Sequence, residues 1–285
     1  MADDWDPFAD PAESAEPAEE IVVPAAEEPV KPKVRYVKAA KVPVKRKIRV
    51  LVLHGTCSSS SIMQKQLYAL TSLSKDELEF VYLDGHLPCT RETTPELVPM
   101  IEQMEKFFGT GPLFQYALPD IDQAAGPVTD PANMLRIYKD LDEGMELLKA
   151  ALEREEPIDA VLGFSQGSNL GNVLTAMAGL GMCKPLCCMV HMCSHKPGWV
   201  SQKPELFAQK IQVPAMVIYG EKDTVAYDRG EIAELYENAV LLSHSGPHQP
   251  LPSGKEGKSL AESILEFIKK QCRVDFYADD FITAA

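Results

Sequence analysis

The stretch AVLGFSQGSNLGNVLTAM, residues 160–177, places Ser165 between Gly163 and Gly167, where an apolar run gives way to a helical pattern. The apolar run before the serine is typical of a strand that is buried on both faces. The apolar residues after it have the spacing of a helix that lies on a sheet: Leu170, Val173, Leu174 and Met177. The stretch therefore predicts a strand, a sharp turn at the serine and a helix.

The same alternation continues on both sides of this stretch. Apolar runs predict strands at 48–55, 77–84, 157–164, 185–193, 213–220 and 240–244. Amphipathic patterns predict helices at 61–73, 96–108, 133–155, 168–180, 203–210, 231–239 and 259–272. This order predicts an α/β fold with a mostly parallel central sheet and helices on both faces, in which ligands bind at the carboxyl ends of the strands.

The chain of 285 residues divides into an arm, a domain and a short tail. Residues 1–46 are rich in Ala, Pro and Glu and then in basic residues, and they predict a disordered arm. Residues 47–272 predict the α/β domain, and 273–285 a C-terminal tail. Within the domain, the Pro- and Gly-rich segment 85–131 predicts a lid-like insertion that covers a pocket, with Phe107, Phe108, Leu113, Phe114 and Tyr116 as candidates for a hydrophobic acyl site or for the core of the insertion.

The charge of the chain is strongly acidic and unevenly distributed. Residues 1–30 carry ten acids and no base, and residues 31–49 carry nine bases and no acid, which leaves 19 basic and 32 acidic residues from position 50 onward. A domain of that charge should repel nucleic acid and anionic membranes. No apolar run is long enough to span a membrane, so we expect a cytoplasmic protein. The basic segment 31–49 leaves a nuclear location open, and the arm is a candidate element for binding a partner.

The sequence offers no convincing site for a metal or a cofactor. Seven cysteines, an odd number in a long chain, predict free thiols. Four of them lie in CKPLCCMVHMC near His191 and His195, but the intervening residues indicate a buried strand and no CxxC pair is present. No GxGxxG motif occurs, and SSSS at 58–61 is expected to cap a helix rather than to bind phosphate.

The Gly-x-Ser-x-Gly motif around Ser165 predicts a nucleophile presented on a strained strand-to-helix turn. A serine nucleophile needs a base and an acid, which in this architecture follow it along the chain, each after a later strand. Asp223 follows one such strand and is preferred as the acid over Asp228, which we expect to cap a helix. After the next strand, His248 in a turn-rich loop is preferred as the base over His244, which ends the strand.

Acyl transfer also requires two backbone N–H groups that stabilise the oxyanion of the transition state. The N–H of Gln166 is expected to supply one of them, and Thr56 or its neighbour Cys57 the other. His54, in the same loop, is expected to hold that loop by hydrogen bonds.

Four stretches of the chain together resemble the signature blocks of the FSH family of serine hydrolases, over about residues 48–271: VLVLHGTCSSS, AVLGFSQGSNL, VPAMVIYGEKDTV and SHSGPHQPLP. The resemblance implies an α/β-hydrolase fold and esterase or thioesterase activity on small acyl substrates. It also implies that Ser165 is the nucleophile, Asp223 the acid and His248 the base. One departure is Pro247, which stands where the family usually has Gly and restricts the loop before His248.

Three functions remain open at this point. The favoured hypothesis is a cofactor-independent serine hydrolase that cleaves carboxylic esters or thioesters through a Ser-Asp-His triad and an acyl-enzyme. The alternative is a non-catalytic α/β-hydrolase-fold module that binds a small ligand or a protein. A peptidase on the same fold ranks last, because no gating domain is evident in the sequence.

Overall fold

The computed structural model describes residues 36–42, 46–122, 130 and 133–273. A six-stranded sheet runs through its centre, with every neighbouring pair parallel. The mostly parallel sheet expected from the alternating pattern is therefore confirmed. The strands lie in the spatial order β10 (Ala239–His244), β9 (Ala215–Gly220), β8 (Cys188–Met192), β7 (Ala160–Phe164), β1 (Ile48–Leu53) and β2 (Leu78–Leu83).

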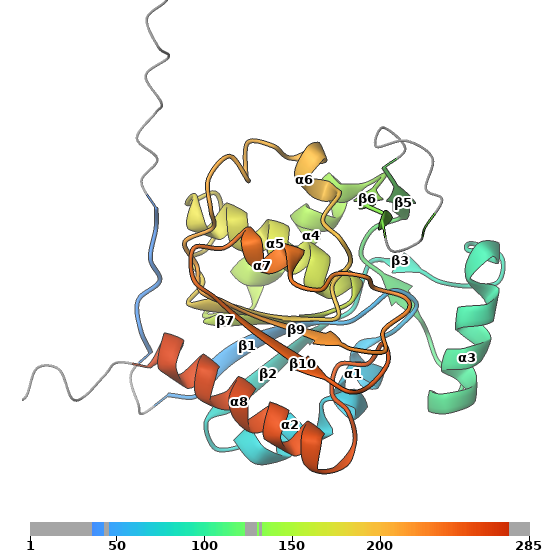
Figure 1. Ribbon diagram of the computed structural model, residues 1–285, viewed down its shortest axis with the longest axis horizontal. Helices are drawn as coiled ribbons and strands as arrows, with labels where there is room; N and C mark the ends of the chain where they lie inside the picture. Colours follow the sequence, from blue (N-terminus) through green and yellow to red (C-terminus); the bar gives the residue numbers. More distant parts are fainter. Residues whose placement is uncertain (1–35, 43–45, 123–129, 131–132, 274–285) are drawn as a thin grey trace, which may run out of the picture. The chain divides into compact units, whose positions relative to one another are not determined.

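Helices cover both faces of the sheet (Figure 1). Strand β1 shows why, because its alternate residues enter two different cores: Leu51 and Leu53 pack on one side, and Val50 and Val52 on the other. The first face is covered by α4 (Leu141–Arg154), α5 (Gln166–Gly179), α6 (Trp199–Gln202) and α7 (Glu231–Glu234). The second is covered by α1 (Ser60–Gln66), α2 (Tyr68–Ser74) and α8 (Gly254–Cys272).

The segment between β2 and α4 forms a separate layer of short elements. In Figure 1 this layer lies on the side toward which the strands of the sheet point. It consists of β3 (Leu87–Pro88), η1 (Pro95–Leu97), α3 (Val98–Phe108), β4 (Phe114–Gln115), β5 (Pro119–Ile121) and β6 (Arg136–Tyr138), with β3 paired to β4 and β5 to β6.

Strand β6 corrects one expectation. The pattern over 133–155 predicted a continuous helix, but Arg136–Tyr138 pair with Pro119–Ile121, and the helix begins only at Leu141. The Asp140 carboxylate accepts a hydrogen bond from the N–H of Leu118 and so ties the start of this helix to the hairpin. Pairing with a segment 15–19 residues earlier in the chain thus overrides the local helical pattern.

The predicted arm and tail fall mostly outside the described residues, which exclude 1–35, 43–45 and 274–285. Residues 36–42, which the sequence assigned to the arm, are described. Val42 is buried, and its N–H donates to the carbonyl oxygen of Cys272 at the end of α8. Val37 likewise donates to the carbonyl oxygen of Gly179 at the end of α5.

Candidate functional site

Ser165 stands on a sharp turn between β7 and α5. Its backbone has φ 53° and ψ −118°, a conformation that residues other than glycine rarely adopt. Such strained backbone often marks a functional position. The flanking glycines are required here, because a Cβ on Gly163 would lie 2.4 Å from the Gly167 oxygen, and one on Gly167 would lie 2.4 Å from the Leu53 oxygen. The turn predicted from the sequence is therefore present, with no room for larger residues at either glycine.

Asp223 and His248 meet beside this turn. The Nδ1 atom of His248 lies 2.7 Å from Oδ2 of Asp223, whose side chain is fully buried. The other oxygen, Oδ1, accepts the N–H groups of Val225 at 2.8 Å and Ala226 at 2.9 Å. Burial alone would raise the pKa of Asp223, but the hydrogen bonds from His248 and the two backbone groups outweigh it and hold this pKa below its ordinary value. The carboxylate is thus ionised and oriented toward the histidine.

The loop that carries His248 accommodates Pro247. The backbone oxygens of Gly246 and Pro247 pack so closely on β9 that a Cβ on Gly220 would lie within 2.7 Å of both. The Gly246 oxygen also accepts the N–H of Lys222. On the far side, the His248 ring packs on Phe164, with the ring centroids 4.8 Å apart. The proline therefore leaves the histidine in contact with Asp223.

Two backbone N–H groups beside the serine are available to a ligand. Those of Thr56 and Gln166 form no hydrogen bond with any residue that the structure describes, whereas the N–H of Cys57 donates to the Cys89 sulfur. Gly55 packs the first loop against the turn, since a Cβ on it would lie 3.2 Å from the Ser165 Cβ. Cys57 has a positive φ of 49°, so this loop is strained as well.

The side chain of Gln166 has a separate role that the sequence did not suggest. Its Oε1 accepts the N–H of Tyr116 at 2.7 Å, and its Nε2 donates to the Ala117 oxygen at 2.8 Å. The Tyr116 hydroxyl in turn accepts the N–H of His54 and donates to the Leu83 oxygen. The residue after the serine thus anchors the insertion to the ends of β1 and β2.

Ser165 and His248 line one cavity of about 280 Å³. Its wall draws on the Gly55–Thr56 loop, on α3 and on the β5–β6 hairpin. The other lining residues are Ser58, Gln66, Leu97, Met100, Gln103, Met104, Pro119, Arg136, Tyr138, Phe164, His195 and Val225.

None of the five residues proposed for an acyl site lines this cavity. Leu113 belongs to a small core of the insertion, with Phe108 packed against it, and the Phe107 side chain is 66% exposed. Tyr116 is fully buried in the main core. Apolar side chains of the insertion that do line the cavity are Leu97, Met100 and Met104.

The competing titratable residues have structural partners. His54 is buried, donates from Nδ1 to the Gly55 oxygen and accepts the N–H of Gly85 at Nε2, and burial lowers its pKa to about 4. His244 accepts the N–H of Gly246. Asp228 accepts the N–H groups of Gly230 and Ile232, as expected for a residue that stabilises the start of α7. These contacts leave Asp223 and His248 as the acid–histidine pair next to Ser165.

One group within the described part of the chain brings three potential metal ligands together, namely Cys193, Asp223 and His248, within 4.8 Å of one another. Burial raises the pKa of the Cys193 thiol to about 12, so the thiolate that a metal would need is disfavoured. The thiol donates instead to the Gln249 oxygen and holds the histidine loop. The arrangement fits an acid–histidine pair better than a metal site.

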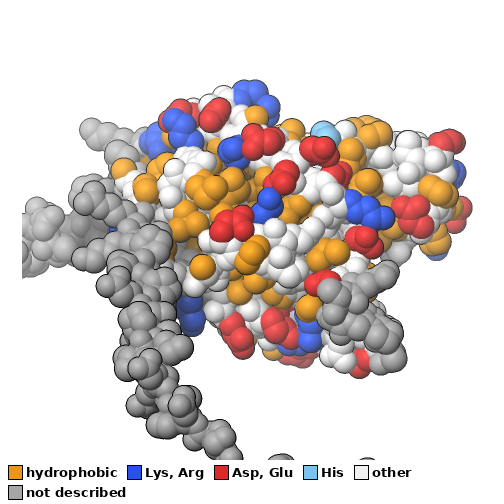
Figure 2. All heavy atoms as spheres, turned by 90° about the horizontal axis from the view of Figure 1, so that it is seen from above, with side chains coloured by type: hydrophobic (Ala, Val, Ile, Leu, Met, Phe, Trp, Pro, Cys, Tyr) orange, Lys and Arg blue, Asp and Glu red, His pale blue; other side chains and the backbone are white. Residues whose placement is uncertain are grey.

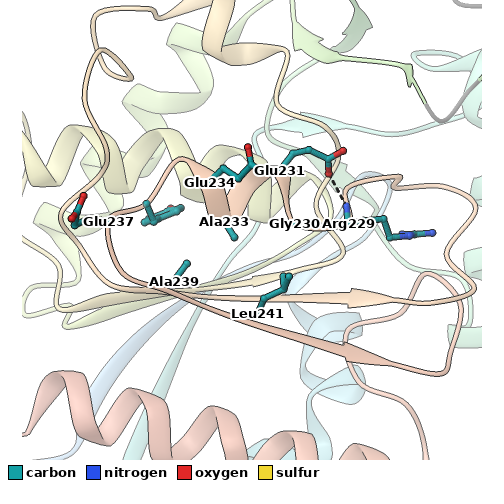
Figure 3. A pocket seen from close by; sticks show the side chains of 9 residues that line it. Arg229, Gly230, Glu231, Ala233, Glu234, Glu237, Ala239 and Leu241 are labelled. Atoms are coloured by element: carbon teal, nitrogen blue, oxygen red, sulfur yellow. Dashed lines mark hydrogen bonds between the residues drawn. The ribbon is translucent and has the colours of Figure 1, made fainter.

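A second hollow, of about 580 Å³, lies between α7 and the edge strand β10 (Figure 3). Its wall is acidic, with Glu231, Glu234 and Glu237, and the Glu231 carboxylate accepts the N–H of Arg229. Neither Ser165 nor His248 lines it. The hollow therefore does not belong to the candidate catalytic site.

The surface shows no large patch of one charge on the face drawn in Figure 2, where acidic side chains are scattered among basic and hydrophobic ones. None of the helices in the described ranges is both long enough and apolar enough to cross a membrane.

Comparison with known proteins gives consistent results. A family model described as serine hydrolase (FSH1) matches residues 44–259. The human protein named esterase OVCA2 is 26% identical over 212 residues, which cover 70% of this chain and 88% of that protein. Among solved structures, Arabidopsis thaliana SOBER1 superposes with a TM-score of 0.51 at 16% identity and covers 79% of this chain and 99% of its own. A dienelactone hydrolase from Anabaena variabilis gives 0.50 at 15% identity, covering 81% and 90%. These structures confirm the α/β-hydrolase fold.

Proposed function

The chain belongs to the serine hydrolase (FSH1) family, and from this premise we propose that it cleaves carboxylic esters or thioesters with Ser165 as the nucleophile. The observation that carries the proposal is the 2.7 Å hydrogen bond between His248 and Asp223, beside the cavity that Ser165 lines. The strained backbone at Ser165 supports it too, because such a turn exposes the hydroxyl above the sheet.

The Asp223 carboxylate determines which ring nitrogen of His248 carries the proton. An ionised carboxylate only accepts, so Nδ1 of His248 carries the proton and Nε2 keeps its lone pair. With Nε2 free to accept, the imidazole takes the proton of the Ser165 hydroxyl as that oxygen attacks the acyl carbon. The imidazolium that forms is stabilised by the buried Asp223 carboxylate.

Unpaired backbone N–H groups beside Ser165 stabilise the negative charge that develops on the acyl oxygen. The N–H of Gln166 lies at the start of α5, and that of Thr56 comes from the facing loop, where the N–H of its neighbour Cys57 is already bonded to the Cys89 sulfur. Each such donor stabilises a transition state by about 3 kcal/mol. Because the donors are fixed by the fold, little reorganisation is needed during the reaction.

The reaction then proceeds in two balanced halves. Collapse of the tetrahedral intermediate breaks the bond to the leaving alcohol or thiol, which takes the proton from His248, and leaves the acyl group on Ser165. Water enters, gives its proton to His248 and attacks the acyl carbon. The acid is released and Ser165 regains its proton, so no cofactor is consumed.

Hydrolysis of p-nitrophenyl butyrate and of a short acyl thioester tests the proposal. Wild type should release p-nitrophenol and free thiol, and Ser165→Ala should lose nearly all of both activities. Ser263→Ala, which removes an exposed hydroxyl on α8 that does not line the cavity, serves as the matched control and should behave as wild type. Intact ligand binding without turnover of either substrate would support a non-catalytic binding module instead.

A further inference from the structure

An arginine stands in the wall of the catalytic cavity. Alternate residues of a strand face the same side, and Arg136 and Tyr138 of β6 both line the cavity together with Ser165. The hairpin is held in place by the N–H of Arg136, which donates to the Lys196 oxygen, and by Gln202, which bonds both backbone groups of Tyr138. Arg136 is thus part of a rigid wall rather than a surface loop.

The guanidinium of Arg136 has no acidic partner in the described chain. Its Nη1 makes one long hydrogen bond, of 3.5 Å, to the backbone oxygen of Asp120, and its Nε is buried with no partner. The carboxylate of Asp120 pairs instead with Lys139, at 3.6 Å. An arginine side chain stays charged and offers five donors, so this wall presents an uncompensated positive charge.

His195 adds a neutral donor beside it. The side-chain oxygen of Asn169 accepts a hydrogen bond from the backbone N–H of His195. The amide nitrogen of Asn169 therefore faces the imidazole ring and donates to its Nδ1 at 3.1 Å. The ring proton is therefore on Nε2, for which no acceptor is present among the described residues. Burial first, and the charge of Arg136 next, hold the pKa of His195 well below its ordinary value. The ring lines the same cavity, with its centroid 6.3 Å from that of His248.

The rest of the cavity wall carries no negative charge. None of its described lining residues is Asp or Glu, although the chain has a net charge of −14. The remainder of the wall is neutral and combines apolar side chains with the polar residues Thr56, Ser58, Gln66 and Gln103. A cavity with one unpaired guanidinium, a neutral imidazole donor, no negative charge and apolar surface beside them is complementary to a carboxylate attached to a short hydrocarbon chain.

We propose that the preferred substrates of this site are esters or thioesters that carry a carboxylate, which pairs with Arg136 and accepts from His195 while the scissile carbonyl lies at Ser165. The inference rests on the proposed hydrolase function and adds a substrate class to it. The carboxylate lies either on the acyl chain, as in a half-ester of a dicarboxylic acid, or on the leaving alcohol.

Two pairs of substrates distinguish these sources. The first pair, p-nitrophenyl hydrogen glutarate and p-nitrophenyl valerate, differs by a carboxylate on the acyl side. The second, 3-carboxyphenyl acetate and phenyl acetate, differs by one on the leaving group. In at least one pair, wild type should give a higher kcat/KM for the charged ester, by about tenfold or more, since one charged hydrogen bond is worth that much.

Arg136→Met should lower this ratio by about 10- to 100-fold, mainly through KM. The ratio is independent of the fraction of active protein, so partial misfolding does not mimic the effect. Lys139→Met removes a positive charge next to the same strand but outside the cavity lining, and it should keep the wild-type ratio. No preference in either pair, or an equal change of the ratio in both variants, would overturn the inference while leaving the hydrolase proposal intact.

A binding measurement separates the inference from turnover altogether. Two amide analogues are titrated calorimetrically into Ser165→Ala and into Ser165→Ala combined with Arg136→Met: N-phenylglutaramic acid carries the carboxylate on the acyl side, and 3-acetamidobenzoic acid carries it on the leaving-group side. The second protein should bind at least one of them about tenfold or more weakly than the first. Equal affinity of the two proteins for both analogues, or no binding of either analogue, would refute carboxylate recognition whether or not esters are cleaved.

Discussion

The replacement Asp223→Asn tests the histidine orientation most severely, because it changes one atom in a fully buried side chain. Asp223 accepts three hydrogen bonds, from the N–H groups of Val225 and Ala226 on Oδ1 and from His248 on Oδ2. An asparagine has one oxygen and one NH₂ group. Its oxygen must face the two backbone donors, since an NH₂ group there would oppose both. The NH₂ group then faces Nδ1 of His248.

The consequence is the wrong tautomer of the imidazole. With a donor opposite Nδ1, the ring accepts there and carries its proton on Nε2, which can no longer accept the proton of the Ser165 hydroxyl. We expect kcat to fall by about 10³- to 10⁴-fold. That loss corresponds to about 4–5.5 kcal/mol of transition-state stabilisation.

The assay is the rate of p-nitrophenyl butyrate hydrolysis at saturating substrate, with thermal unfolding measured on the same samples to establish that the variants are folded. Asp228→Asn is the matched control, since Asp228 is buried as well but bonds to backbone groups at the start of α7 and to the Glu231 side chain, and not to His248. It should change kcat by less than about tenfold. A variant Asp223→Asn that retains a tenth or more of wild-type kcat, or an equal loss in Asp228→Asn, would refute the tautomer argument.

Three further predictions concern stability, pH and the cavity. Gln166→Ala leaves the N–H of Tyr116 and the oxygen of Ala117 without their partners, so urea unfolding should show a loss of about 2–4 kcal/mol, and a loss below 1 kcal/mol would contradict the anchoring role. The pKa of Asp223 is lower in the fold than in the unfolded chain, so its contribution to stability is present above the unfolded pKa and is lost as pH falls through the folded pKa. Asp223→Asn should therefore lower the free energy of unfolding more at pH 7 than at pH 3. A loss at pH 3 that equals or exceeds the loss at pH 7 would contradict a lowered pKa of Asp223 in the fold. Met104→Ala enlarges the cavity and should shift the preference among p-nitrophenyl esters of graded length toward longer acyl chains, whereas an unchanged profile would place the acyl group elsewhere.

Local patterns were sufficient to predict the sheet, because each of its strands is an apolar run bounded by turn residues. They failed where a contact between distant residues decides the structure. Arg136–Tyr138 continues a helical pattern, yet it pairs with β5. The short helix expected near 203–210 likewise lies earlier, at Trp199–Gln202, where the Trp199 ring is buried and its indole N–H donates to Asn172. Neither partner is visible from the spacing of apolar residues.

The candidate site likewise contains residues that the sequence could predict and residues that it could not. Ser165, Asp223 and His248 follow strands that the pattern located, so their meeting at one edge of the sheet could be foreseen. Arg136 and Tyr138 could not, because they reach the cavity through an unexpected hairpin. His195 could have been predicted as a site residue, since it also follows a strand, but the sequence analysis considered it only as a zinc ligand beside the cysteines. The sequence did not identify Met100 and Met104 as cavity residues, because the aromatic residues of the insertion were the more obvious apolar candidates. Of these, Phe108 packs against the core of the insertion and Tyr116 lies in the main core.

Mapping the site of covalent labelling tests the central claim, that Ser165 is the nucleophile, most directly. The protein is incubated with a fluorophosphonate, digested and analysed by mass spectrometry. The account predicts a single adduct on Ser165, its absence in Ser165→Ala, and much slower labelling in His248→Gln, where the base that activates the hydroxyl is missing. An adduct on a different residue, or equal labelling of wild type and Ser165→Ala, would contradict it.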